Sequence, residues 1–227
     1  MEFEPARGHT ISAAGTTMDG LLPSLRVILI GGASHTGKST LARPLASALG
    51  WEYRATDKLA KHPGRPWRND GTHVPPHVVE HYATLSVDDL VADVLRHYER
   101  NVLPQIDALV RAHASDPSLA GLVLEGSALW PELVAPLVSD KVGALWLTAS
   151  GDLLMKRIYA ESHYAEKSPQ EQLLIRKFLE RTLVYGGRME RAVSEHRLLS
   201  VRVRPSDTAE TLVRRCVKAI ASDCSGT

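Results

Sequence analysis

Cysteine is scarce in this sequence: the 227 residues include only two, Cys216 and Cys224, both near the C-terminus. Two cysteines at this spacing provide neither a disulfide framework nor the pattern of a cysteine metal site. Disulfides are rare in reducing compartments, so a chain without them fits the cytoplasm, where we expect this protein.

Long apolar runs and an excess of one charge are lacking too. No stretch approaches the about 20 apolar residues that are needed to cross a membrane. The formal net charge is +1, which creates no overall field that would attract nucleic acid or an anionic membrane. Internal repeats and low-complexity tracts are also absent. We therefore expect no nucleic-acid or membrane partner, and we disfavour an enzyme that acts on RNA ends.

The length and composition are those of one folded unit. A chain of 227 residues with 44% hydrophobic and 23% charged residues suits a single soluble α/β domain. Residues 1–24 contain no apolar segment typical of a signal peptide, so we interpret them as a flexible tail. The folded domain is expected over residues 25–222, followed by a short tail at 223–227.

The most informative segment runs from Arg26 to Gly50 and reads RVILIGGASHTGKSTLARPLASALG. Its residues 27–30 are apolar and partly β-branched, which indicates a buried parallel strand. Residues 39–49 have apolar side chains at positions 41, 45, 46 and 49, which is helical spacing, and Gly50 ends the helix. A short glycine-rich loop therefore connects a strand to the N-terminus of a helix.

This loop matches the phosphate-binding pattern G-x-x-x-x-G-K-[ST] at every fixed position. Glycines let the backbone wrap closely around a phosphate, and the helix N-terminus adds partial positive charge. Lys38 should reach the β- and γ-phosphates of ATP, and the Ser39 hydroxyl should hold Mg²⁺. The expected nucleotide-binding residues of this P-loop are Gly32, Ala33, Ser34, His35, Thr36, Gly37, Lys38, Ser39 and Thr40.

Strands and helices are expected to alternate along the rest of the chain. Further strands are predicted at residues 51–55, 122–124, 142–147 and 198–203. Further helices are predicted at residues 77–82, 87–113 with a break near Pro104, 131–138, 153–162, 170–196 and 208–221, the last with Asp207 as N-cap. This alternation predicts a parallel sheet that helices cover on both faces.

From the P-loop onward the chain resembles the small P-loop kinases, such as adenylate, shikimate and gluconate kinases and chloramphenicol phosphotransferase. The stretch LVLEGSALWPE, which contains Glu125 and Gly126, also resembles part of the 2-phosphoglycerate-kinase-like proteins. The resemblance covers roughly residues 25–222. It implies a three-layer α/β/α fold with a five-stranded parallel sheet and ATP as the phosphoryl donor. It also implies an acceptor-binding region near residues 58–115 and a helical lid near residues 157–181.

Two carboxylates at predicted strand ends are candidates for chemistry. By the resemblance, Asp57 would contact the hydroxyl of the phosphoryl acceptor and orient it or accept its proton. A helix cap or a solvent-exposed Asp is the alternative. Glu125 could hold Mg²⁺ through water or, together with Gly126, bind hydroxyl groups of the acceptor. A solvated strand end is the alternative for Glu125.

Basic residues of the lid and of the loop after Asp57 form a second group of candidates. The lid segment offers Arg157 and Arg176, which by the resemblance would contact the transferring phosphoryl group, although long helices often carry solvated arginines. In the loop KHPGRPWRNDGTH, Arg65 and Arg68 could clamp a phosphate or carboxylate, and Trp67 could stack on a ring. A plain surface connection is equally compatible with this loop.

Two further patterns carry weaker expectations. The resemblance places the loop around Arg204 and Pro205 against adenine, mainly through backbone groups. The segment from His77 to His81 matches H-x-x-E-H, a zinc-peptidase motif whose two histidines share one helix face. The sequence alone identifies no further zinc ligand, so a role of this segment at the helix surface or in the substrate pocket is favoured over zinc binding.

Together these features favour an ATP- and Mg²⁺-dependent kinase that phosphorylates a hydroxyl, or a phosphate, of a small molecule. Two alternatives remain open. The first is a nucleoside or nucleotide kinase with the same mechanism and a pocket that recognises a base. The second is a regulatory nucleotide-binding protein in which hydrolysis switches a partner and no small-molecule acceptor exists.

Overall fold

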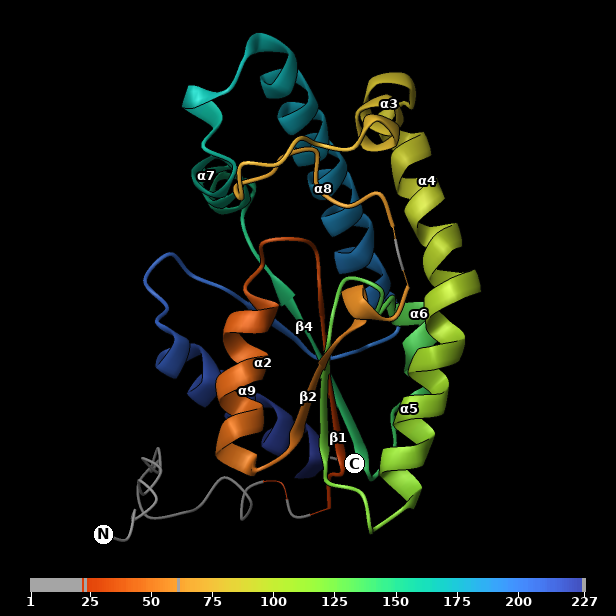
Figure 1. The fold of residues 1–227 in the computed structure, drawn as a ribbon. Coiled ribbons are helices and arrows are strands. Elements are labelled where there is room, and N and C mark those ends of the chain that lie inside the picture. The colour runs from red at the N-terminus through yellow and green to blue at the C-terminus, as the bar shows by residue number, and fades with distance from the viewer. Residues whose placement is uncertain (1–21, 23, 61, 226–227) are drawn as a thin grey trace, which may run out of the picture.

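A five-stranded parallel sheet forms the centre of the molecule in this computed structural model, which describes residues 22, 24–60 and 62–225. The strand order is β2-β3-β1-β4-β5 (Figure 1). The strands are β1 Val27–Gly32, β2 Glu52–Ala55, β3 Leu122–Glu125, β4 Val142–Thr148 and β5 Ser200–Arg202. The predicted α/β class and five-stranded parallel sheet are confirmed. The expected N-terminal tail lies almost entirely outside the described residues.

Helices cover both faces of the sheet. One face packs against α2 Lys38–Leu49 and α9 Ala209–Ser225, and the other packs against α5 Leu103–Ser115, α6 Pro131–Val134 and α8 Pro169–Glu195 (Figure 1). Strand β1 explains this arrangement, because Ile28 and Ile30 join the first core while Val27 and Leu29 join the second. All four side chains have no exposed surface, as expected for a central strand with two buried faces.

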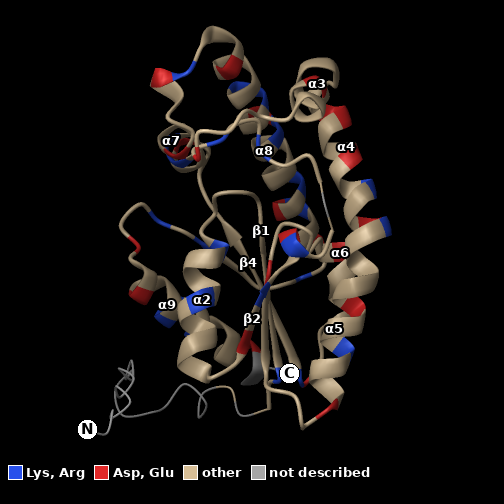
Figure 2. Cartoon of the chain, in the orientation of Figure 1, with Lys and Arg blue, Asp and Glu red and all other residues tan. Residues whose placement is uncertain are grey.

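A third apolar cluster lies beyond the carboxyl ends of the strands, in the upper part of Figure 1. It joins α3 Pro76–Thr84, α4 Val87–His97, α7 Gly151–Glu161 and the first half of α8. Charged residues of both signs are distributed along these helices (Figure 2). This upper part therefore has its own core above the sheet edge that carries the P-loop.

The described residues contain no helix that is both long enough and apolar enough to span a bilayer.

Several boundaries differ from the predicted ones. The predicted break near Pro104 is a π-helical turn, Tyr98–Val102, which separates α4 from α5. Pro104 lies in the first turn of α5, where its lack of an N–H group leaves no helical hydrogen bond unmade. Asp207 is not the N-cap of α9: the Thr208 hydroxyl accepts the Thr211 N–H at 3.2 Å, while Asp207 accepts the Arg204 N–H at 2.8 Å. Helix α9 also continues to Ser225, so residues 223–225 belong to it and not to a tail.

Gly31 on β1 packs closely against the side chain of Trp146 on the neighbouring strand β4. A Cβ atom at this position would overlap the indole ring of Trp146 on β4. That ring is buried, and its Nε1–H donates to the Leu129 carbonyl at 2.8 Å, so it cannot easily move aside. Gly31 is therefore required by packing, one residue before the P-loop begins.

We predict that Gly31→Ala lowers the free energy of unfolding by about 1–3 kcal/mol, the usual cost of overfilling a core. The matched control is Gly187→Ala in α8, where a Cβ atom would meet no described atom within 4 Å. Because alanine is the better helix former, this control should raise the stability by about 0.5–1 kcal/mol. Urea unfolding of both variants measures the difference, and a Gly31→Ala protein as stable as the wild type would contradict the packing argument.

Candidate functional site

The P-loop follows directly from β1 and has the backbone of a phosphate cradle. Gly32, His35 and Gly37 have positive φ angles of 144°, 64° and 101°. Such angles are accessible to glycine and bend the loop back over the start of α2. Within the described residues, no side chain caps the first turn of α2, whose N-cap is Gly37. The amide groups of this turn are therefore left available to an anion.

Lys38 lies beneath this loop. Its side chain is buried, and its Nζ donates a hydrogen bond to the Ala33 carbonyl at 2.8 Å. Burial lowers the pKa of Lys38, while the nearby carboxylates of Glu125 and Asp57 partly offset that effect. The ammonium is thus held within the loop by one carbonyl, facing a cavity where phosphate oxygens would complete its hydrogen bonds.

Ser39 and Glu125 provide adjacent oxygen atoms beside Lys38. The Ser39 hydroxyl donates to Glu125 Oε1 at 2.7 Å, and the Tyr53 hydroxyl donates to the same oxygen at 2.9 Å. Glu125 is only 5% exposed, at the end of β3. Desolvation and the hydrogen bond to Glu125 raise the pKa of Tyr53. A hydroxyl and a carboxylate side by side form the kind of oxygen donor set that suits Mg²⁺.

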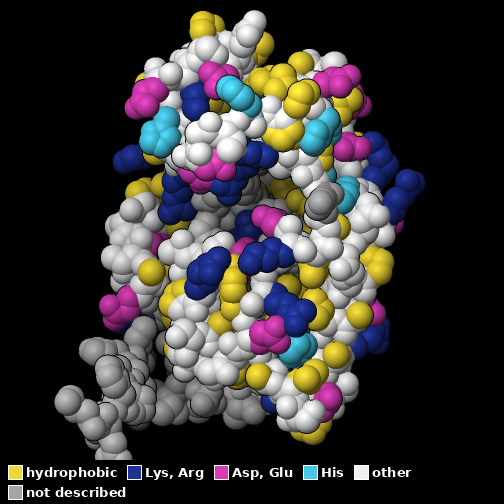
Figure 3. Space-filling model, viewed as in Figure 1, with side chains coloured by type: hydrophobic (Ala, Val, Ile, Leu, Met, Phe, Trp, Pro, Cys, Tyr) yellow, Lys and Arg dark blue, Asp and Glu magenta, His cyan; other side chains and the backbone are white. Residues whose placement is uncertain are grey.

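Two cavities meet above the P-loop. The first, of about 540 Å³, is lined by P-loop residues together with Glu125, Arg157 and Glu161. The second, of about 270 Å³, extends under the upper part of the molecule and is lined by His62, Tyr98, Arg181 and others. The residues that line both cavities are Ser34, Asp57, Arg65 and Ser127. Figure 3 shows this face hollowed between its upper and lower parts, with charged side chains around the hollow.

Asp57 therefore lies at the junction of the two cavities. It is exposed, in a short 3-10 turn, Thr56–Lys58, directly after β2. The position of this turn depends on Gly126, where a Cβ atom would overlap the Thr56 side chain. The predicted role of Gly126 was acceptor binding, and the structure gives it this packing role beside Asp57.

A polar network connects the P-loop to helix α7 of the lid. Arg157 Nη1 donates to the His35 carbonyl at 2.8 Å, and burial lowers the pKa of Arg157. The buried His35 ring lies 2.9 Å from Glu161 Oε2, and Arg65 pairs with the same carboxylate. The hydrogen bond from His35, and then the charge of Arg65, hold the pKa of Glu161 below its usual value despite desolvation. Sequence reasoning found Arg157 and Arg65 but missed Glu161.

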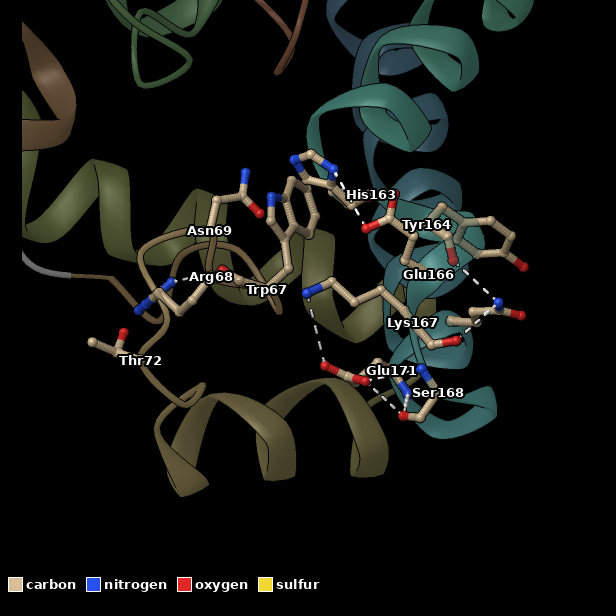
Figure 4. A network of polar contacts seen from close by, with 12 residues as sticks. Trp67, Arg68, Asn69, Thr72, His163, Tyr164, Glu166, Lys167, Ser168 and Glu171 are labelled. Atoms are coloured by element: carbon tan, nitrogen blue, oxygen red, sulfur yellow. Dashed lines mark hydrogen bonds and ion pairs between the residues drawn. The ribbon is translucent and has the colours of Figure 1, made fainter.

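The structure does not bring all predicted site residues to these cavities. Trp67 is buried against Phe178, with ring centroids 4.8 Å apart, and Arg68 donates to the carbonyls of Arg65 and Trp67. Arg176 donates to the Tyr164 hydroxyl at 2.6 Å. Figure 4 shows the loop with Trp67 and Arg68 beside the lid segment that carries Tyr164. For the part of the chain that the structure describes, neither cavity lining includes these three predicted residues.

The predicted adenine loop is exposed. Arg204 and Pro205 lie between β5 and α9 and line neither of the two cavities, as far as the chain is described. The Asp207 carboxylate in the same loop partly offsets the lowering of the Arg157 pKa by burial. A role of these residues at adenine stays a prediction.

The smaller cavity contains residues that carried no sequence motif. Arg181 Nη1 donates to the Tyr82 hydroxyl at 3.0 Å, and its buried Nε has no partner among the described residues. Burial raises the pKa of both Tyr98 and Tyr185. The Tyr185 hydroxyl donates to the Ser127 carbonyl, where the cavities meet. This pocket thus combines a cation with neutral phenol groups.

Comparisons with known proteins agree with this architecture. The chain is matched by no family model and by no curated protein sequence. It is similar to the structure of a gluconokinase from Sinorhizobium meliloti 1021, with 19% identity, a TM-score of 0.53, and coverage of 90% of this chain and 95% of that chain. It is also similar to shikimate kinase from Aquifex aeolicus, with 13% identity, a TM-score of 0.51, and coverage of 88% and 99%. The chain has the fold of the small P-loop kinases.

We predict that Lys38→Ala weakens ATP binding by at least about 10-fold, because a hydrogen bond to a charged group contributes about 1.5–3 kcal/mol. The fold should persist, since losing one hydrogen bond to Ala33 costs about 1 kcal/mol and the desolvation of the ammonium is relieved. Lys58→Ala, at an exposed lysine near the same cavities, is the control and should bind ATP normally. Calorimetric titration and urea unfolding test this, and unchanged affinity in Lys38→Ala would remove Lys38 from the phosphate site.

Proposed function

We propose that this protein is an ATP- and Mg²⁺-dependent phosphotransferase that phosphorylates a hydroxyl group of a small molecule. The observation that carries the proposal is the position of Asp57, a carboxylate at the junction between the P-loop cavity and a second, smaller cavity. A kinase needs a donor site and an acceptor site that open onto each other, with a group between them that orients the acceptor. The kinase fold of the chain is consistent with this arrangement.

The donor phosphates would bind to the P-loop amides and to Lys38. Lys38 would place its ammonium between the β- and γ-phosphates, where its charge stabilises the oxygens as the bond to the leaving ADP breaks. The Ser39 hydroxyl and the Glu125 carboxylate would hold Mg²⁺, which supplies positive charge at the same oxygens. Tyr53 keeps Glu125 oriented through its own hydrogen bond.

The acceptor would occupy the smaller cavity. Asp57 would accept a hydrogen bond from the reacting hydroxyl and hold its oxygen toward the γ-phosphate, taking the proton as the new bond forms. Arg65 and Arg181 supply positive charge on two other walls of this cavity. A volume of about 270 Å³ and two arginines favour a small hydroxylated molecule with a carboxylate or phosphate group.

The lid would close the donor site. Arg157 is already bonded to the P-loop through the His35 carbonyl, and Glu161 of the same helix contacts His35 and Arg65. These contacts would let α7 sense an occupied P-loop and exclude water from the transferring phosphoryl group. Arg157 lines the P-loop cavity and is the lid arginine that we assign to the phosphoryl oxygens.

The direct test is a screen for ADP release from MgATP with nucleosides, nucleotides, sugars, sugar phosphates and hydroxy acids. We expect an anionic hydroxylated compound to raise ADP release above the rate with water alone, and mass spectrometry should find one added phosphate on it. A response limited to nucleosides or nucleotides would favour a nucleotide kinase. Nucleotide hydrolysis that responds to none of these compounds would favour the regulatory alternative and contradict the proposal.

Asp57→Asn provides a sharper test once an acceptor is known. Asparagine keeps the size of the side chain but removes its charge and basicity, so phosphoryl transfer should fall by about 100-fold or more. ATP affinity should stay within a few-fold, because in this proposal Asp57 contacts the acceptor hydroxyl and not the nucleotide. Asp140→Asn, at an exposed turn far from the cavities, is the control. Full transfer activity in Asp57→Asn would reduce Asp57 to a wall residue, and a collapse of ATP affinity would place it in the donor site.

A further inference from the structure

Three metal-ligating side chains from separate segments meet beside the smaller cavity, which one of them, His62, also lines. His62 lies in the loop after β2, His81 lies in α3, and Asp93 lies in α4. One ligand atom from each residue falls within 4.8 Å of the others. The segments are separated in sequence, so the tertiary fold brings these three side chains together and no local motif records them.

The imidazoles of this cluster have unused nitrogen atoms. Among the described residues, Nε2 of His62, His81 and the neighbouring His97 are buried and have no hydrogen-bond partner. The His62 ring centroid lies 5.8 Å from that of His81 and 5.1 Å from that of His97. A buried polar atom without a partner is costly, so the free Nε2 atoms of His62 and His81, which lie beside Asp93, point to a ligand between them.

The charge state of the cluster suits a cation ligand. A metal ion binds imidazole through a ring nitrogen that carries no proton, and the buried Nε2 atoms of His62 and His81 have no hydrogen-bond partner among the described residues. Asp93 contributes the negative charge that opposes Arg181, and its contact with exposed Arg96 at 3.2 Å is a surface pair of little strength.

We propose that His62, His81 and Asp93 form a binding site for a divalent transition-metal ion of the Zn²⁺ type. Two imidazole nitrogens and one carboxylate form a donor set typical of Zn²⁺ or Co²⁺, whereas Mg²⁺ and Ca²⁺ prefer oxygen donors alone. Ligand atoms around a tetrahedral Zn²⁺ lie about 3.3 Å apart, so the cluster needs only small side-chain rotations to close on an ion. The site is separate from the Mg²⁺ ligands proposed above, Ser39 and Glu125, while His62 also lines the smaller cavity.

This site gives a different account of the H-x-x-E-H pattern. His81 is a ligand in the proposed site, whereas His77 and Glu80 of the same pattern are exposed and do not belong to the cluster. The ion would tie the loop that carries His62 to α3 and α4. Because that loop also supplies Gly64 and Arg65 to the smaller cavity, the ion would fix one wall of the cavity in place.

Titration of the metal-free full-length chain with Co²⁺ tests the site, in the absence of nucleotide and with excess Mg²⁺ present. We expect one ion per chain and visible absorption bands of the intensity typical of a four-coordinate site. His62→Gln, His81→Gln and Asp93→Asn should each weaken binding by about 100-fold or more, since loss of even an outer partner costs about 10–100-fold. His77→Gln, which removes an exposed histidine of the same helix, should bind Co²⁺ like the wild type.

Thermal unfolding with and without Zn²⁺ distinguishes variants that have lost the metal site from variants that have lost the fold. Zn²⁺ should raise the unfolding temperature of the wild type and of His77→Gln, because an ion that binds only the folded chain stabilises it. His62→Gln changes a loop residue, so it should fold without metal and show no such rise. Absence of saturable Co²⁺ binding, or equal binding by the wild type and all three ligand variants, would overturn the proposal.

Discussion

The hydrogen bond between Lys38 and the Ala33 carbonyl is the contact around which the site is organised. It holds a buried ammonium inside a loop whose backbone is bent at Gly32, His35 and Gly37. The loop can take this shape because β1 is buried on both faces between β3 and β4, which leaves its carboxyl end as a rigid support. Glu125 reaches the same place from the end of β3, so the sheet itself sets the distance between the cation and the oxygen donors.

The upper part of the molecule turns this phosphate cradle into a site with two compartments. Its separate apolar cluster holds α3, α7 and α8 above the sheet edge, and the smaller cavity lies beneath them. The contacts of His35 and Arg65 with Glu161 join the two parts across the cavity that would hold the donor. The P-loop and α7 are therefore connected through the Glu161 carboxylate and through the hydrogen bond from Arg157 to the His35 carbonyl.

Sequence reasoning could point to those site residues that belong to a short sequence pattern or follow directly after a predicted strand. The P-loop pattern places Lys38 and Ser39 by itself, whereas Asp57 was predicted through the resemblance to the small P-loop kinases and Glu125 from its place at a strand end. Trp67 and Arg176 line neither cavity for a physical reason: an aromatic ring in a polar loop can fold into a distant apolar cluster, and an arginine can pair with a tyrosine of its own lid. His62, His81 and Asp93 meet only through tertiary packing, so spacing along the chain carried no signal for them.

The central claim is that the P-loop binds the terminal phosphates of a nucleotide, and a displacement titration tests it most directly. ATP bound to the full chain in the presence of Mg²⁺ would be displaced by ADP, AMP and adenosine in separate titrations. Because the cradle is built for the β- and γ-phosphates, ADP should displace ATP at least about 10-fold more effectively than AMP, and adenosine should be weaker still. Equal displacement by AMP, adenosine and ADP would show that affinity resides in the base and sugar, and it would contradict the account.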